Sequence, residues 1–213
     1  DWPVDEAGPY RTGYRTMPYT YTAQATGEDR TIDVHVWYPT EATTGEHPTY
    51  EVIFEDPISL LNAPLAPSPN SDGYPVHVYS HGNMGFGGAS PFLMRHFASH
   101  GWVVVAPDHT GNTLSDNINP RPPQTYLNRA TDVSAVLDWL ETLPESDPLH
   151  KKTLTEQAIL SGHSFGAHTC WASAGATFDM GQVTADCSSA TGSFSGGPCT
   201  ETELNAFGAG VGD

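Results

Sequence analysis

The 213-residue sequence predicts an α/β fold, built on an open, mostly parallel sheet with helices on both faces. Segments typical of strands and of helices alternate three times between residues 75 and 178, which is the order that produces such a sheet. One strand segment, WVVVAPD at 102–108, is apolar along its length, as strands buried on both faces are. This length suits one domain, so residues 1–213 are expected to form a single unit.

The first third of the chain is expected to add little regular structure. Residues 1–30 are rich in Tyr and Thr and are predicted to be irregular. In TIDVHVWYP at 31–39, apolar residues alternate with others up to Pro39, which predicts an antiparallel, half-exposed strand. Residues 40–74 hold many Pro, Asn, Ser and Asp residues, which favour a loop with short elements at most.

The alternating part begins with PVHVYSHG at 75–82, a short strand that ends in glycine. SPFLMRHFASHG at 90–101 is a predicted helix, with Ser90 as its N-cap and Gly101 as its C-terminal stop. After the apolar strand, TYLNRATDVSAVLDWLETL at 125–143 places its apolar residues at helical spacing. These segments supply two of the three expected strand–helix pairs.

The third pair meets at a chemically suggestive junction. The strand QAILSG at 157–162 runs directly into a helix predicted over 165–178, and the junction GHSFG matches the pattern G-x-S-x-G. A strand–turn–helix of this kind holds a nucleophilic serine, here Ser164, on a strained backbone. The flanking Gly162 and Gly166 leave room for it, and the helix N-terminus favours negative charge nearby. The alternative is a tight turn with an incidental serine.

A second glycine-rich loop follows the first strand of the alternating part. His81 and Gly82 end that strand, and small residues let backbone N–H groups approach a substrate carbonyl. We expect the N–H groups of Asn83 and Phe165 to form an oxyanion hole. His81 and His163 flank the two loops and are expected to be structural. The alternative for this loop is a glycine-rich turn without function.

Together these motifs resemble those of a known family. The stretches YSHGNMGFGGASPFLMRHFASHGWVVVAPDHTGNT, RATDVSAVLDWL and GHSFGAHT resemble the bacterial relatives of platelet-activating-factor acetylhydrolase, among the dienelactone-hydrolase-like α/β hydrolases. The resemblance covers most of residues 8–180. It implies an α/β-hydrolase fold and a serine esterase or lipase that cleaves carboxylic esters without a cofactor. Ser164 would be the nucleophile, and Asn83 and Phe165 would supply the oxyanion N–H groups.

Three other functions stay open beside this one. Cutinase-like polyester hydrolases share the fold, so a polyester is an alternative substrate. A different hydrolase chemistry, such as that of a peptidase, is possible on the same scaffold, and so is a catalytically inactive binding module.

The resemblance also implies that part of the catalytic machinery lies elsewhere. In the family, the acid follows the strand after the serine helix, and the histidine follows the last strand. After Ser164 this sequence contains one histidine, His168, and the aspartates Asp179, Asp186 and Asp213, none at a matching position. We therefore expect residues 1–213 to be the N-terminal portion of the domain. A C-terminal fragment of the same protein is expected to supply the Asp and His.

Two of the three cysteines, Cys187 and Cys199, bracket a Ser- and Gly-rich loop without helix or strand pattern, which predicts a disulfide. Cys170 is predicted to be a buried free thiol. Neither the cysteines nor the ten histidines show the spacing of a metal site, so no metal is expected.

The charge and hydropathy of the chain exclude some classes of partner. The formal net charge is −17, which repels nucleic acid and anionic membranes. No apolar run is long enough to span a bilayer, and the N-terminus lacks the pattern of a signal peptide. The missing signal pattern fits a cytosolic protein or a mature secreted one whose signal has been removed. With the expected disulfide, we expect a secreted or periplasmic protein, and the resemblance implies a small-molecule or lipid ester as its partner.

Overall fold

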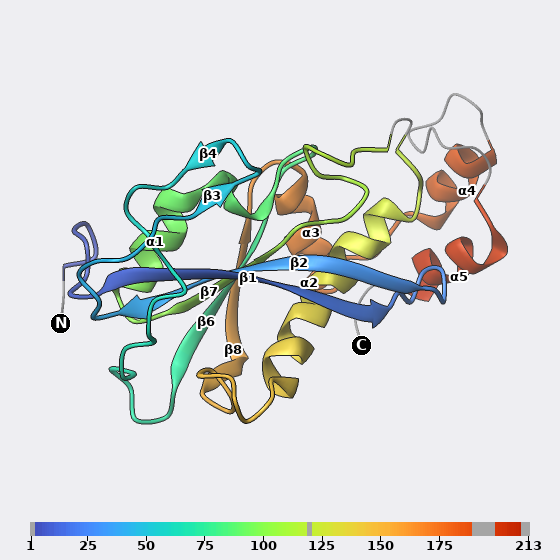
Figure 1. Cartoon of the computed structure of the whole chain (residues 1–213). Helices are drawn as coiled ribbons and strands as arrows, with labels where there is room; N and C mark the ends of the chain where they lie inside the picture. The colour runs from blue at the N-terminus through green and yellow to red at the C-terminus, as the bar shows by residue number, and fades with distance from the viewer. Residues whose placement is uncertain (1–2, 119–120, 189–198, 210–213) are drawn as a thin grey trace.

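The computed structural model describes residues 3–118, 121–188 and 199–209, and it confirms the α/β class (Figure 1). The strands of the central sheet are β1 (Arg11–Thr22), β2 (Asp29–Thr40), β5 (Leu60–Leu61), β6 (Tyr74–Ser80), β7 (Val103–Pro107) and β8 (Thr153–Gly162). Their order is β5-β1-β2-β7-β6-β8. β7, β6 and β8 are parallel, and β2 runs antiparallel to both of its neighbours.

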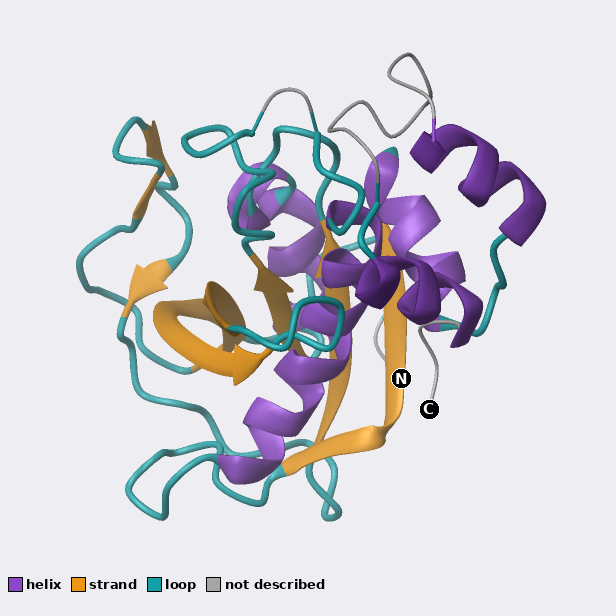
Figure 2. Ribbon diagram, turned by 90° about the vertical axis from the view of Figure 1, so that its right-hand side faces the viewer, coloured by secondary structure: helices purple, strands orange, loops and turns teal. Residues whose placement is uncertain are grey.

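Helices cover both faces of this sheet, as expected from the sequence. They are the short 3-10 helix η1 (Gly87–Ala89), α1 (Pro91–Ser99), α2 (Thr125–Thr142), α3 (Phe165–Ser173), α4 (Met180–Ser188) and α5 (Glu201–Ala209). A separate two-stranded sheet joins β3 (Thr49–Tyr50) to β4 (Phe54–Glu55). Figure 2 shows helices on either side of the strands, with long irregular connections around them.

Alternate residues of the central strands divide between two cores because strand side chains point to opposite faces in turn. Val103 and Val105 pack with Val136 of α2 in one core. Val104 and Ala106 pack in the other core, which α1 covers. All of β7 is buried, so its continuous apolar sequence is explained by its central place between β2 and β6.

β8 is the outermost strand on the side of the sheet that bears the G-x-S-x-G junction. Its residues are half-buried or exposed throughout, in contrast to those of β7. Ile159 is 39% exposed although it lies in the apolar run AIL. The edge of β8 opposite β6 has no paired strand among the described residues.

Two expectations for the first third of the chain were wrong. Residues 1–30 are not irregular throughout, because β1 pairs with β2 along twelve residues. Tyr and Thr are strand formers, and Pro18 is tolerated because it lies beyond the two-residue pairing of β1 with β5. The strand at 31–39 is antiparallel as predicted, but it is half-exposed only up to Asp33: residues 34–40 are all buried, and β2 continues through Pro39 to Thr40.

Later helices also differ from expectation. The helix after Ser164 ends at Ser173 rather than 178, and α4 and α5, which Figure 1 shows together at one end of the molecule, were not predicted. Ser90 occupies the N-cap of α1 but makes no capping bond, because its hydroxyl is bonded to the hydroxyl of Tyr79. Gly101 has a φ of +89°, which fits the predicted helix stop.

The predicted disulfide between Cys187 and Cys199 is present and ties the end of α4 to the segment before α5. The loop expected between them falls on residues 189–198, which lie outside the described residues. Cys170 is free as predicted but only half-buried. Within the described ranges, no helix is both long and apolar enough to cross a membrane.

Candidate functional site

Ser164 lies at the turn between β8 and α3, where it is exposed and forms the N-cap of the helix. Its backbone has φ 54° and ψ −115°, a combination that residues with a side chain rarely adopt. Ser164 thus combines a strained backbone with a position at the carboxyl end of a strand, where open α/β sheets bind their ligands. This is the geometry that the G-x-S-x-G pattern predicts.

The two flanking glycines are required by close backbone contacts. A Cβ on Gly166 would overlap the carbonyl oxygen of Ser80, at the end of the neighbouring strand β6. A Cβ on Gly162 would in turn overlap the backbone of Gly166. The His163 N–H donates to the Ser80 carbonyl at 3.2 Å, and the His163 carbonyl accepts from Gly166 at 2.8 Å. The turn is therefore packed directly onto the end of β6.

The loop after β6 reaches the serine, as the oxyanion-hole prediction requires. A Cβ on Gly82 would lie 3.4 Å from the Cβ of Ser164 and 3.1 Å from the His163 ring. Asn83 follows and is exposed. Neither the Asn83 N–H nor the Phe165 N–H donates a hydrogen bond to any described residue.

His81 holds the base of this loop and has no contact with solvent. Its Nε2 accepts the His109 N–H at 3.1 Å, so its proton is on Nδ1, which donates to the Gly82 carbonyl at 2.7 Å. Burial, together with the nearby His109 ring, lowers the pKa of His81 well below its usual value. The ring is a neutral structural element at pH 7.

A Ser–His–Asp arrangement that does not include Ser164 lies beneath the site and is entirely buried. His109 shares hydrogen bonds with Ser80 Oγ at 2.8 Å and with an Asp132 carboxylate oxygen at 2.7 Å. Burial lowers the pKa of His109 to about 4, so the neutral ring donates from Nδ1 and accepts at Nε2. The three side chains have the residue types of a hydrolytic triad, but no substrate can reach a wholly buried Ser80.

Asp132 is the centre of that cluster. Arg30 donates two hydrogen bonds to its carboxylate, at 2.8 and 2.9 Å, and the Tyr21 hydroxyl donates a third at 2.6 Å. Burial would raise the pKa of Asp132, but Arg30 and His109 outweigh it and hold this pKa well below the usual range. Asp108 is similarly tied, to His35 and to the N–H of Gly87. Asp108 and His109 thus hold neighbouring loops in place.

The hydroxyl of Ser164 has no hydrogen-bond partner among the described residues. His163 precedes it and is exposed, and its ring lies over Gly82. His168 packs along the flank of α3, with its ring centroid 5.6 Å from that of Tyr126 and 5.7 Å from that of Phe165. In the part of the chain that the structure describes, no cluster of His, Cys, Asp or Glu side chains could hold a metal.

Comparison with known proteins identifies the family of this chain. The sequence profile of the family described as Chlorophyllase matches residues 42–188, more than half of the chain. The chain belongs to the chlorophyllase family. The match includes the loop after β6, all of α2 and the Ser164 turn of this chlorophyllase-family chain. No curated protein matches it. The narrower resemblance to relatives of platelet-activating-factor acetylhydrolase stays a prediction.

A solved structure shows the same fold as the chlorophyllase-family chain. A ferulic acid esterase from Streptomyces cinnamoneus superposes with a TM-score of 0.61 at 22% sequence identity. The alignment covers 78% of this chain and 55% of the esterase, so the chain spans little more than half the length of that protein. The expected α/β-hydrolase fold is confirmed.

Sequence reasoning missed the polar side chains beneath the site of the chlorophyllase-family chain. Arg129 and Asp132 lie three residues apart in α2, and both are wholly buried. Charged residues between the apolar positions Leu127, Ala130 and Val133 could have indicated this, since an ordinary amphipathic helix exposes its charges. Which groups they meet depends on β2, β6 and α3, which are distant in sequence.

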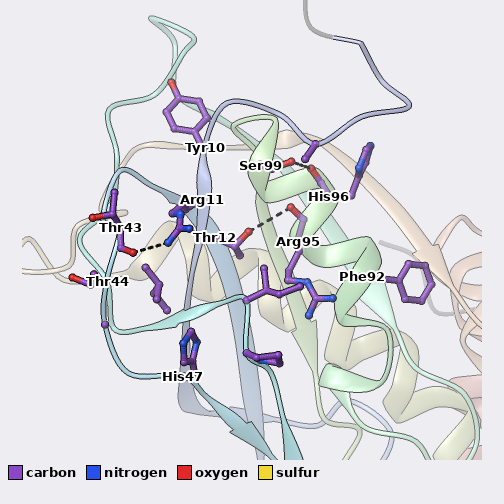
Figure 3. Close-up of a pocket in the computed structure, with 15 residues that line it drawn as sticks. Tyr10, Arg11, Thr12, Thr43, Thr44, His47, Phe92, Arg95, His96 and Ser99 are labelled. Atoms are coloured by element: carbon purple, nitrogen blue, oxygen red, sulfur yellow. Dashed lines mark hydrogen bonds between the residues drawn. The ribbon is translucent and has the colours of Figure 1, made fainter.

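One cavity of the chlorophyllase-family chain lies away from Ser164. It has a volume of about 700 Å³ and lies between the start of β1, the start of α1 and the loop around His47 (Figure 3). Arg11 and Arg95 contribute to its wall, but their guanidinium groups already donate to the Thr43 carbonyl and to Asp56. No residue of the Ser164 turn lines this cavity.

Proposed function

We propose that the chain carries the nucleophile of a serine carboxylic-ester hydrolase, an esterase or lipase. The observation that carries the proposal is the backbone of Ser164, with its positive φ at the carboxyl end of β8 and the N-terminus of α3. A non-glycine residue is seldom held in such a conformation without a functional reason. The ester hydrolysis implied by the chlorophyllase family name supports the same activity.

The proposed reaction is acyl transfer through the serine. Ser164 Oγ attacks the ester carbonyl carbon while a histidine base accepts its proton. The carbonyl oxygen becomes an oxyanion, which the N–H groups of Asn83 and Phe165 stabilise. The intermediate collapses as the C–O bond to the alcohol breaks and the histidine returns the proton to that alcohol. Water then attacks the acyl carbon while the histidine accepts its proton. The bond from this carbon to Ser164 Oγ breaks as the histidine returns the proton to Oγ, which releases the acid and restores Ser164.

The histidine and its acid are proposed to come from a segment of the same protein outside residues 1–213. The free edge of β8 supports this, because an apolar strand at an unpaired edge is normally covered. Ile159 on β8 is 39% exposed and Trp171 on α3 is 75% exposed, and both would be covered by a further layer there. The Cys187–Cys199 disulfide supports an extracellular or periplasmic location.

Labelling with a fluorophosphonate probe tests the nucleophile, since only an activated serine reacts. The complete protein, including any sequence after Asp213, is expected to take up one probe per molecule and to hydrolyse p-nitrophenyl esters. Ser164→Ala should abolish both. Ser161→Ala, three residues earlier on β8, is the matched control and should retain them.

Each outcome has a defined meaning. Labelling that persists in Ser164→Ala would place the nucleophile elsewhere. A correctly folded protein that neither labels nor turns over any ester would favour an inactive binding module. Turnover of amide analogues in preference to esters would favour a peptidase, and turnover of a polyester film would favour a cutinase-like substrate.

A further inference from the structure

One guanidinium lies beneath both segments that carry the proposed oxyanion donors. Arg129, on α2, is wholly buried, and no described carboxylate forms an ion pair with it. Burial lowers its pKa to about 9, so it is still charged at pH 7. A buried charge without a directly bonded carboxylate is costly even though the nearby Asp132 carboxylate offsets part of the cost, and an apolar residue of similar size would avoid it. The contacts of Arg129 with the loop of Asn83 and with the start of α3 indicate a role that explains the buried charge.

On one side, Arg129 holds the loop that presents Asn83. Its Nη2 donates to the His81 carbonyl and to Ser80 Oγ, the latter at 3.2 Å. Its Nη1 donates to Asn112 Oδ1 at 2.8 Å, and Asn112 Nδ2 in turn donates to Asn83 Oδ1, also at 2.8 Å. Two consecutive hydrogen bonds therefore connect the guanidinium to the side chain of Asn83.

On the other side, the same group holds the start of α3. Nε of Arg129 donates to Thr169 Oγ1 at 3.0 Å. The guanidinium carbon lies 4.5 Å from the centroid of the Phe165 ring, within the range of a cation–π contact. Because the guanidinium is rigid and planar, these contacts fix Asn83 and Phe165 relative to each other.

We propose that Arg129 is a positioning residue that sets the spacing of the Asn83 and Phe165 N–H groups, and thereby the strength of oxyanion stabilisation. The proposal rests on the proposed esterase function. Oxyanion donors act only within about 2.7–3.1 Å of the developing charge, and a misplacement of about 1 Å can cost on the order of a hundredfold in rate. A residue that sets the separation of the two oxyanion donors therefore affects the stability of the transition state more than the affinity for the substrate.

Two substitutions release one arm each without emptying the guanidinium site. Thr169→Val removes the acceptor of Nε but keeps the side-chain shape, and Asn83→Ala removes the side-chain tether but keeps the backbone N–H. Each should lower kcat about tenfold and leave KM within about twofold. Arg129→Lys keeps the charge but loses the planar fork, and should lower kcat about a hundredfold.

Thr142→Val is the matched control for Thr169→Val. Both threonines lie in helices and donate from Oγ1 to the carbonyl four residues earlier, at 3.1 Å in each case. Only Thr169 also accepts from Arg129. Thr142→Val should therefore keep wild-type kcat.

Rates are measured in the complete protein with a p-nitrophenyl ester, per active site titrated by fluorophosphonate. Affinity for an alkyl trifluoromethyl ketone, which forms a tetrahedral adduct with a serine hydroxyl, is expected to fall in parallel with kcat. Thr169→Val and Asn83→Ala with wild-type kcat per site and wild-type inhibitor affinity would overturn the role of Arg129, even if their unfolding midpoints fell. A wild-type protein without labelling or turnover would instead overturn the esterase function and this proposal with it.

Discussion

Gly166 lies against the carbonyl oxygen of Ser80 so closely that no side chain fits between them. The contact joins the start of α3 to the end of β6, and thus the Ser164 turn to the strand that leads into the loop of Asn83. Neither backbone can move away alone, because His163 is bonded to both Ser80 and Gly166. The position of the serine is therefore set by two strands rather than by its own turn.

Gly166→Ala is expected to destabilise the protein by about 2–3 kcal/mol, because the added methyl group must displace backbone atoms. Fluorophosphonate labelling should fall with it. Urea unfolding and labelling rates measure the two effects. Gly208→Ala, in α5, is the control, since its Cβ would meet only the side-chain methyl carbon of Met180 in α4, at 3.8 Å. Equal stability of the two variants would contradict the packing argument.

Ser164→Gly is expected to stabilise the fold by about 1 kcal/mol while it removes the nucleophile. Glycine adopts a positive φ without strain, and Ser164 makes no side-chain capping bond that would be lost. Ser164→Ala keeps the strain and should match the wild-type unfolding midpoint. The comparison of the two variants in urea isolates the strain, and a glycine variant no more stable than the alanine variant would show that none is stored.

Asp132→Asn is expected to cost about 3–5 kcal/mol, because it leaves the Arg30 guanidinium without its buried partner. Asp138→Asn, at an exposed position of the same helix, should change stability by less than about 0.5 kcal/mol. Chemical denaturation of the two variants measures the difference. A loss shared by both would indicate a general charge effect on α2 instead.

Stability is expected to fall as the pH is lowered from 7 towards 4. Burial lowers the pKa of both His77 and His109 to about 4 from an ordinary value of 6.5. The unfolded chain therefore binds these protons first, so the stabilisation is complete above about pH 6.5 and is lost as the pH falls through this window. Each group contributes at most about 1.4 kcal/mol per pH unit.

Urea unfolding at pH 7, 6 and 5 measures this slope. His77→Gln removes one of the two titrating groups, while its side-chain amide can still bond to Ser161, the present partner of the His77 ring. The variant should show a shallower fall than the wild type. A slope that is unchanged would mean that His77 takes up its proton equally well in the folded protein.

The sequence by itself determined the local parts of this protein. The strand at 102–108, the helix at 125–143 and the GHSFG junction follow from apolar periodicity and from glycines at a turn, which are properties of neighbouring residues. The placing of Ser164 on a strained turn also follows from local sequence. β1 was missed because its Thr and Tyr pattern forms a strand only when β2 is beside it.

Only the tertiary structure decided what lies beneath the site. Arg129 meets Asn112, Thr169 and the His81 carbonyl, and Asp132 meets Arg30 and His109, although all of these are far apart along the chain. The folding of α2 and α3 against the neighbouring parallel strands β6 and β7 brings them together. Buried charges of this kind are stable only where distant partners surround them, so no local pattern could have specified their contacts.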